Sequence, residues 1–210
     1  QSAVEIASNA IDCIHTTAAS HGRVFIVEVM GHKVGWLTLY AGIAGGADII
    51  LIPEIPYDIK AIIEALQKRQ RAGSRFSIIV VAEGAISKET AALSKKERKT
   101  KLASRRYPSV AYEIGAEIQA ITGQEVRVTV PGHTQRGGAP NPYDRVLSSR
   151  LGARAAKLIS EGRFGEMVVI RNNEITSIPL EESAGKLKTV DPNSSIVEEA
   201  RLLGLSFGDR

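Results

Sequence analysis

The chain has 210 residues, of which 43% are hydrophobic and 24% charged, and its formal net charge is +4. This composition supports at least one hydrophobic core and excludes an intrinsically disordered chain. No apolar run approaches the roughly 18 residues that a membrane helix needs, and no signal peptide is predicted, so we expect a cytoplasmic protein that does not bind membranes.

Apolar residues at helical spacing predict a helix at the very start of the chain. They are Val4, Ala7, Ile11 and Ile14. The only cysteine, Cys13, excludes an internal disulfide, and we expect its thiol to be buried. Because the chain begins with Gln1 and already follows a helical pattern there, we expect it to be a fragment.

Four apolar runs predict strands, and helical patterns separate them. The runs cover residues 24–30, 49–52, 76–82 and 126–130. Strands that alternate with helices pair in parallel in layered α/β proteins. The sequence therefore predicts an α/β fold with a layered parallel sheet.

Glycines mark the ends of the helices between these strands. An apolar stripe over residues 59–66 is followed by Gly73, and a stripe over 110–121 is followed by Gly123. A third, longer helix is predicted to start at Asn141-Pro142 and to end near Gly162. Its predicted buried side consists of Val146, Leu147, Leu151, Leu158 and Ile159.

The last part of the chain is predicted to form a hairpin and a helix. Residues 167–170 and 174–178 are strand-like and flank Asn172-Asn173, a plausible two-residue turn. Residues 194–205 are predicted to form a peripheral helix.

A basic segment, residues 88–106, contains eight Lys or Arg residues and two Glu residues. We interpret it as solvated surface. A nucleic-acid site would need stacking aromatic residues, and only Tyr107 lies at the edge of this segment, so we predict no nucleic-acid partner.

Polar residues follow three of the predicted strands. Gly31, His32 and Lys33 follow the first strand, Glu83 follows the third, and a glycine-rich loop, residues 132–138, follows the fourth. Ligands of open α/β sheets bind beyond the carboxyl ends of parallel strands. We therefore expect these three strand ends to form one site for a polar ligand.

The residue types in these loops favour a phosphosugar. His133 and Arg136 can donate to a phosphate, whereas Glu83 would accept from a sugar hydroxyl and would repel a bare phosphate. Each residue also has an ordinary structural interpretation: a packed histidine, a surface arginine and a helix-capping glutamate. No catalytic residue and no metal ligand are predicted in the chain.

Two stretches of the chain resemble bacterial 6-phosphofructokinases. One covers residues 27–36, 44–48 and 52–54. The other matches the fructose-6-phosphate signature, with Arg127 six positions before His133, then Gln-Arg-Gly-Gly at 135–138 and Asp-Arg at 144–145. The resemblance covers about residues 3–160 and implies a C-terminal portion that lacks the N-terminal donor-binding half.

The resemblance also implies roles for individual residues. Met30 and Gly31 would contact the sugar, Glu83 would accept from its hydroxyls, and His133 and Arg136 would hold the 6-phosphate. His32 stands where many relatives have an arginine, and Lys33 follows it, so both remain possible contacts.

Two arginines of the resemblance, Arg23 and Arg127, lie at the starts of their predicted strands. At about 3.3 Å per residue they would be roughly 20 Å from the loops that follow. In the family, the equivalent arginines reach into the site of a neighbouring subunit. A homo-oligomer, a dimer or tetramer, is therefore implied.

The domain organisation follows from the same resemblance. Residues 1–134 would form the smaller, sugar-phosphate-binding domain, and residues 135–165 would return to the larger donor domain. Residues 166–210 would form a C-terminal hairpin and helix.

The implied reaction is phosphorylation of the 1-hydroxyl of fructose 6-phosphate to fructose 1,6-bisphosphate in glycolysis. The donor, ATP or pyrophosphate, and Mg2+ would bind the missing half, which in the family carries a Thr-Ile-Asp-Asn-Asp run with the catalytic base, so this chain alone should be inactive. Two alternatives remain: a non-catalytic sugar-phosphate-binding module, and a nucleic-acid binder that uses residues 88–106.

Overall fold

The computed structural model describes residues 1–18 and 23–210. The chain divides into two compact units. The first, here called the sheet unit, contains residues 3–137 and 189–210; the second, the helix–hairpin unit, contains residues 1–2 and 138–188.

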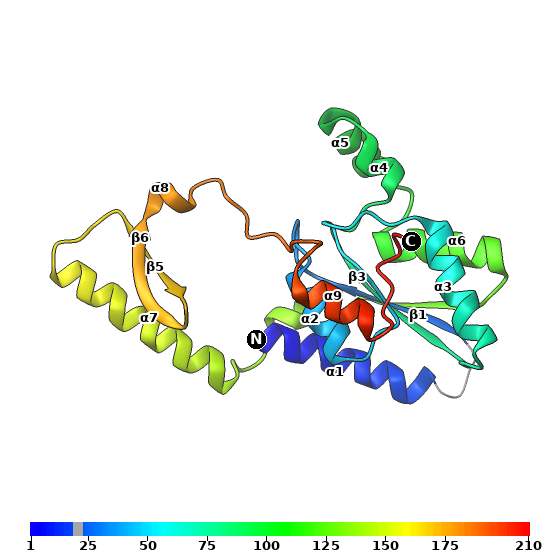
Figure 1. The fold of residues 1–210 in the computed structure, drawn as a ribbon, viewed down its shortest axis with the longest axis horizontal. Helices are drawn as coiled ribbons and strands as arrows, with labels where there is room; N and C mark the ends of the chain where they lie inside the picture. Colours follow the sequence, from blue (N-terminus) through cyan, green and yellow to red (C-terminus); the bar gives the residue numbers. More distant parts are fainter. Residues whose placement is uncertain (19–22) are drawn as a thin grey trace. The chain divides into compact units, whose positions relative to one another are not determined.

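A four-stranded sheet forms the centre of the sheet unit (Figure 1). Its strands are β1 (Val24–Val29), β2 (Ile49–Leu51), β3 (Ser77–Ala82) and β4 (Val126–Thr129). The strand order is β2-β3-β1-β4, and every pairing is parallel. The predicted α/β class and parallel sheet are confirmed, and all four strands fall within the predicted runs.

Helices cover both faces of this sheet (Figure 1). One face packs against α1 (Ser2–Ala18), α2 (Trp36–Ala44) and α9 (Ser195–Leu202), and the other against α3 (Ile59–Arg71) and α6 (Val110–Thr122). Successive residues of β1 point to opposite faces of the sheet: Val27 packs in the hydrophobic cluster with α1, α2 and α9, and Ile26 packs in the cluster with α3 and α6. This double burial explains why the strands are continuously apolar.

The helix ends agree with the glycine signals in the sequence. Gly73 follows α3 with φ of +88°, and Gly123 caps α6 in the left-handed conformation with φ of +70°. Glycine adopts this conformation without the steric cost that a Cβ imposes.

Two expectations about burial in the sheet unit were wrong. Cys13 is exposed, because α1 buries the face that carries Ala7 and Ile11, and Cys13 lies two residues from Ile11, on another side of the helix. The last helix, α9, is not peripheral. Val197 and Ala200 are each only 1% exposed and belong to the core beneath the sheet.

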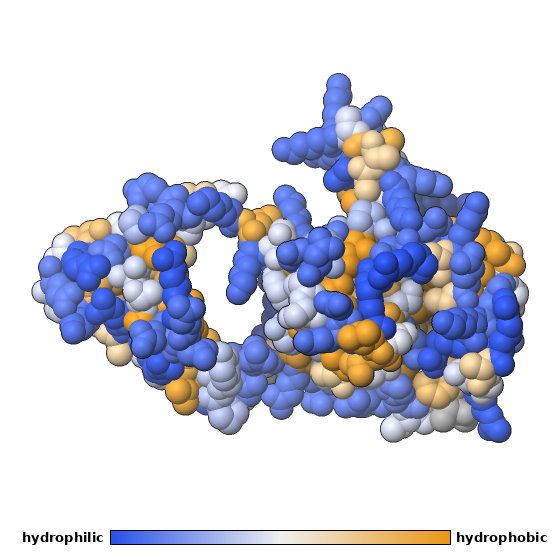
Figure 2. All heavy atoms as spheres, in the orientation of Figure 1, coloured by the Kyte–Doolittle hydropathy of each residue, from blue (hydrophilic) through white to orange (hydrophobic). Residues whose placement is uncertain are grey.

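The basic segment forms two short helices, α4 (Lys88–Ala92) and α5 (Lys95–Ala103), that project from the rest of the sheet unit (Figure 1). Ser94 and Glu97 form a capping box at the start of α5, and α5 has no buried residue. Figure 2 shows hydrophilic residues over most of this projection. α5 is solvated surface, as predicted, whereas Thr90 of α4 is buried.

In the helix–hairpin unit, α7 (Pro142–Ser160) packs against the antiparallel strands β5 (Glu166–Arg171) and β6 (Glu174–Pro179), and a short helix, α8 (Leu180–Ser183), follows. The carboxamide of Asn141 accepts a hydrogen bond from the N–H of Asp144 at 2.9 Å, which confirms the predicted cap. Asn172 and Asn173 have φ of +51° and +64°, as a two-residue hairpin turn requires.

The predicted buried side of α7 was only partly correct. Leu158 is 3% exposed and Leu147 and Leu151 are half-buried, but Val146 and Ile159 are 59% and 63% exposed. Val146 directly precedes Leu147, and Ile159 directly follows Leu158. One residue corresponds to a rotation of about 100° around the helix, so these two side chains lie off the packed face.

From Thr189 the chain belongs to the sheet unit again, so the hairpin and α9 lie in different units. The N–H of Ile50 donates to the carbonyl of Ser206 at 2.8 Å, which attaches the C-terminal segment to β2. The functional domain boundaries at 134 and 165 stay a prediction. Among the described residues, no helix is long and apolar enough to cross a membrane.

Candidate functional site

The loops that follow β1, β3 and β4 meet at the carboxyl edge of the sheet. Because β1 is hydrogen-bonded to β3 on one side and to β4 on the other, these three strand ends are neighbours. The structure thus brings together the three chain segments that carry Met30, Gly31, Glu83, His133 and Arg136.

Glu83 connects the end of β3 to the loop after β1. Its Oε1 accepts hydrogen bonds from the N–H groups of Gly31 at 3.1 Å and His32 at 2.6 Å. No hydrogen bond to Oε2 is found among the described residues. One carboxylate oxygen therefore fixes the loop, and the other is available to a ligand.

The β1 and β3 loops approach each other so closely that only glycine fits at position 84. A Cβ on Gly84 would lie 2.1 Å from the carbonyl oxygen of His32, far inside van der Waals contact. His32 itself has a left-handed φ of +55°, which is uncommon for a residue with a side chain. The conformation of the β1 loop depends on this contact and on Glu83.

Gln135 connects the loop after β4 to the same β1 loop. It is 2% exposed; its Oε1 accepts from the N–H of Met30 and its Nε2 donates to the carbonyl of Gly132, both at 3.1 Å. Sequence reasoning did not assign this role, and the only signal was the position of Gln135 between His133 and Arg136. Three strand ends are thus joined by two polar side chains, Glu83 and Gln135.

His133 and Arg136 lie on one side of the short 3-10 helix η1 (Gly132–Arg136) that contains Gln135. Residues three apart in such a helix stand above one another. Both residues are exposed, and neither side chain makes a hydrogen bond or ion pair with another described residue. The loop therefore presents the unused side-chain N–H donors of His133 and Arg136 on one face. This arrangement is suited to binding an anion.

Arg23 and Arg127 lie at the opposite edge of the sheet, at the amino ends of β1 and β4. Arg23 precedes β1, and Arg127 pairs in register with Phe25. The six residues of β1 separate this edge from Met30 by roughly 20 Å. Arg23 and Arg127 therefore lie near each other, and both are far from His133 and Arg136.

A carboxylate that sequence reasoning missed lies between these arginines. Arg23 Nε donates to Glu125 Oε2 at 2.5 Å, and a terminal amino group of Arg127 pairs with Glu125 Oε1. The hydrogen bond from Arg23, assisted by the charge of Arg127, lowers the pKa of Glu125 below its ordinary value. We name these three residues the Glu125 cluster.

His32 and Lys33, the other possible contacts, are exposed in the β1 loop. No group of three or more His, Cys, Asp or Glu residues that could hold a metal is found within residues 1–18 and 23–210.

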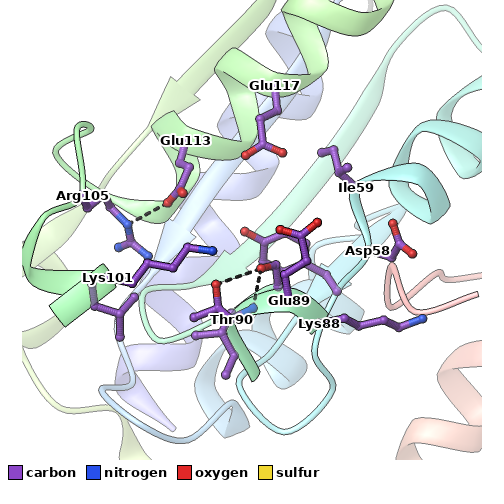
Figure 3. A pocket seen from close by; sticks show the side chains of 13 residues that line it. Asp58, Ile59, Lys88, Glu89, Thr90, Lys101, Arg105, Glu113 and Glu117 are labelled. Carbon is purple, nitrogen blue, oxygen red and sulfur yellow. Dashed lines mark hydrogen bonds and ion pairs between the residues drawn. The ribbon is translucent and has the colours of Figure 1, made fainter. Parts of the chain in front are cut away.

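A cavity of about 140 Å³ lies elsewhere in the sheet unit, between the α4–α5 projection and α6 (Figure 3). Its lining mixes both charge signs: Arg105 pairs with Glu113 at 2.7 Å, and Glu117 faces the same space. Partial desolvation, then the charges of Glu113 and Glu89, raise the pKa of Glu117. None of the predicted substrate-binding residues lines this cavity.

Comparisons with known proteins agree on one family. The family model described as Phosphofructokinase matches residues 1–159. The chain is 56% identical over 208 residues to the ATP-dependent 6-phosphofructokinase of Spirochaeta thermophila, covering 99% of this chain and 57% of that protein. It is 48% identical over 207 residues to that of Chloroflexus aurantiacus, covering 99% of this chain and 56% of the relative.

Solved structures show the same fold. Phosphofructokinase from Saccharomyces cerevisiae matches with a TM-score of 0.70 and 35% identity, over 87% of this chain and 23% of that chain. A pyrophosphate-dependent phosphofructokinase from Marinobacter aquaeolei matches with a TM-score of 0.70 and 21% identity, over 98% of this chain and 51% of the other. The chain thus spans just over half the length of the curated relatives described above.

Proposed function

The chain belongs to the phosphofructokinase family, and we propose that it forms the fructose-6-phosphate-binding part of a 6-phosphofructokinase. The proposed reaction transfers a phosphoryl group to the 1-hydroxyl of fructose 6-phosphate and gives fructose 1,6-bisphosphate in glycolysis. The observation that carries this proposal is the pair of unused donors, His133 and Arg136, on one face of a loop joined to two other strand ends.

The proposed contacts divide between the two ends of the ligand. The guanidinium of Arg136 and an imidazole N–H of His133 bind the 6-phosphate. Met30 and Gly31 contact the sugar, and the second carboxylate oxygen of Glu83 accepts from a sugar hydroxyl. A charge-assisted hydrogen bond contributes about 1.5–3 kcal/mol, so each phosphate ligand would change affinity by roughly 10- to 100-fold.

Arg23 and Arg127 are proposed to bind the phosphate in the site of a neighbouring subunit. Their position at the opposite edge of the sheet supports this assignment, because they are too far from the loop of His133 to serve the same ligand. A homo-oligomer, a dimer or tetramer, follows. In the same proposal, residues 1–134 act as the smaller domain, residues 135–165 return to the donor domain, and residues 166–210 add the C-terminal hairpin and helix.

ATP is the proposed phosphoryl donor, with Mg2+. The names of the relatives at 56% and 48% identity support ATP over pyrophosphate, since the pyrophosphate-dependent structure is only 21% identical. The chain spans just over half the length of these relatives, and we assign the donor and Mg2+ to the remaining part of the complete protein. Phosphoryl transfer requires both, and this chain alone is therefore proposed to be inactive. A cytoplasmic location follows from the glycolytic role.

Calorimetric titration with fructose 6-phosphate tests the proposal in the protein that carries this chain. The dissociation constant should rise about 10- to 100-fold in Arg136→Ala. Lys99→Ala is the control for the loss of one positive charge, because Lys99 is exposed on α5 and is not among the residues proposed to bind phosphate; its affinity should change less than about two-fold.

An Arg136→Ala variant with wild-type affinity would remove Arg136 from the site. Full affinity without any turnover in the protein that carries this chain would instead favour a non-catalytic sugar-phosphate-binding module.

A further inference from the structure

We infer that Glu125 is a positioning residue that holds Arg23 and Arg127 together as a single phosphate-binding unit. The inference rests on the proposed function, because it concerns the two arginines assigned there to a neighbouring subunit's ligand. It adds a residue that acts only through those arginines.

The register of the sheet places the three residues of the Glu125 cluster side by side. Val24 of β1 pairs with Val126 of β4, and the N–H of Val24 donates to the carbonyl of Glu125 at 3.1 Å. Arg23 and Glu125, which precede these two valines, are therefore neighbours across the strands. Glu125 and Arg127 are two residues apart and share a face, because side chains alternate along a strand.

The contacts with Glu125 leave most phosphate-binding donors unused. Arg23 contributes only its Nε, and among the described residues its two terminal amino groups make no other hydrogen bond. Arg127 contributes one terminal amino group. The side chains of Arg23 and Arg127 are 26% and 58% exposed, so a ligand can reach their remaining donors.

The charges of the cluster favour a dianion. Two adjacent guanidinium groups repel each other, and the carboxylate between them offsets that repulsion while it fixes their orientation. One net positive charge and several aligned N–H donors remain for a phosphate. If Glu125 instead competed with the phosphate for the arginines, its removal would tighten binding, so the sign of the effect separates the two roles.

The removal of Glu125 should leave the fold intact. Its side chain is 44% exposed, and ion pairs at exposed positions contribute little to folding stability. A change in ligand affinity without a change in the unfolding midpoint is therefore the signature of positioning.

The test measures the dissociation constant and KM for fructose 6-phosphate in the protein that carries this chain. We expect Glu125→Gln to raise both about 3- to 10-fold, with kcat and the unfolding midpoint nearly unchanged and with partial rescue in Glu125→Asp. In a background that already contains Arg23→Ala and Arg127→Ala, Glu125→Gln should have no further effect. Glu64→Gln, on the exposed side of α3, is the control and should leave all four quantities unchanged.

The outcomes separate this inference from the proposed function. Unchanged or tighter binding in Glu125→Gln, while Arg127→Ala and Arg136→Ala weaken binding, overturns the positioning role alone. If neither Arg127→Ala nor Arg136→Ala weakens binding, the proposed function is wrong and the inference is overturned with it.

Discussion

Gln135 and Met30 are 105 positions apart in the sequence, yet the buried carboxamide of Gln135 accepts the backbone N–H of Met30 at 3.1 Å. The same side chain donates to Gly132, so it fixes both the β1 loop and the loop that carries His133. Removal of the carboxamide takes away the acceptor of the Met30 N–H.

Replacement of Gln135 by alanine should therefore affect both stability and binding. An unpaired buried polar group costs about 1–3 kcal/mol, and we expect the free energy of unfolding to fall by that amount. Fructose 6-phosphate should bind more weakly, because the loops lose their common support. Urea denaturation and calorimetry measure the two effects, with Gln119→Ala on the exposed side of α6 as control. Wild-type stability and affinity in Gln135→Ala would contradict this role.

Gly84→Ala should disturb the site through steric contact alone. The added Cβ would lie 2.1 Å from the carbonyl oxygen of His32, so the β1 loop must move. Overpacking of this kind costs about 1–3 kcal/mol, so the free energy of unfolding should fall by about that amount. The affinity for fructose 6-phosphate should fall as well.

Gly152→Ala is a matched control for Gly84→Ala. Gly152 lies within α7, and no atom lies within 4 Å of the Cβ that alanine would add. Alanine is favoured over glycine inside a helix by about 0.5–1 kcal/mol, so this variant should be slightly more stable. Equal behaviour of the two variants in thermal melts would show that the contact with His32 carries no strain.

The raised pKa of Glu117 predicts a pH-dependent stability. Partial desolvation at the cavity, with the charges of Glu113 and Glu89, makes the folded protein bind this proton more tightly than the unfolded chain, where the pKa is near 4.5. The stabilising effect of protonation is complete below pH 4.5 and is lost as the pH rises through the folded pKa.

Glu117→Gln should therefore melt at a higher temperature than the wild type at pH 7, and the two should converge below pH 4.5. Scanning calorimetry across this range checks the sign. Glu64→Gln serves as the comparison, since Glu64 lies on α3 and does not line the cavity that Glu117 faces. A wild type that is as stable as Glu117→Gln at pH 7 would refute the prediction.

Most of the fold could be predicted from local patterns. The apolar runs predicted the strands. The residue types at Gly73, Gly123 and Asn172-Asn173 predicted helix ends and a turn, and in the structure these residues have the left-handed φ values that such positions require. These signals are local, because each depends on a few neighbouring residues.

The errors came from packing that no local pattern determines. A helical stripe does not decide which neighbouring element covers it, and so Cys13, Val146 and Ile159 were assigned to the interior although they are exposed. The candidate site shows the same limit. Its loops were found from strand ends, but Gln135 and Glu125 contact residues more than 100 positions away, through a sheet register that spacing does not reveal.

The central claim is that the loops after β1, β3 and β4 bind a sugar phosphate. Hydrogen exchange followed by mass spectrometry, with and without fructose 6-phosphate, tests it most directly in the protein that carries this chain. Peptides that contain Met30 to Lys33, Glu83 and residues 132–138 should exchange more slowly with the ligand, whereas peptides from α5 should not change. Unchanged exchange in all three loops at saturating ligand, or protection confined to α5, would contradict the account.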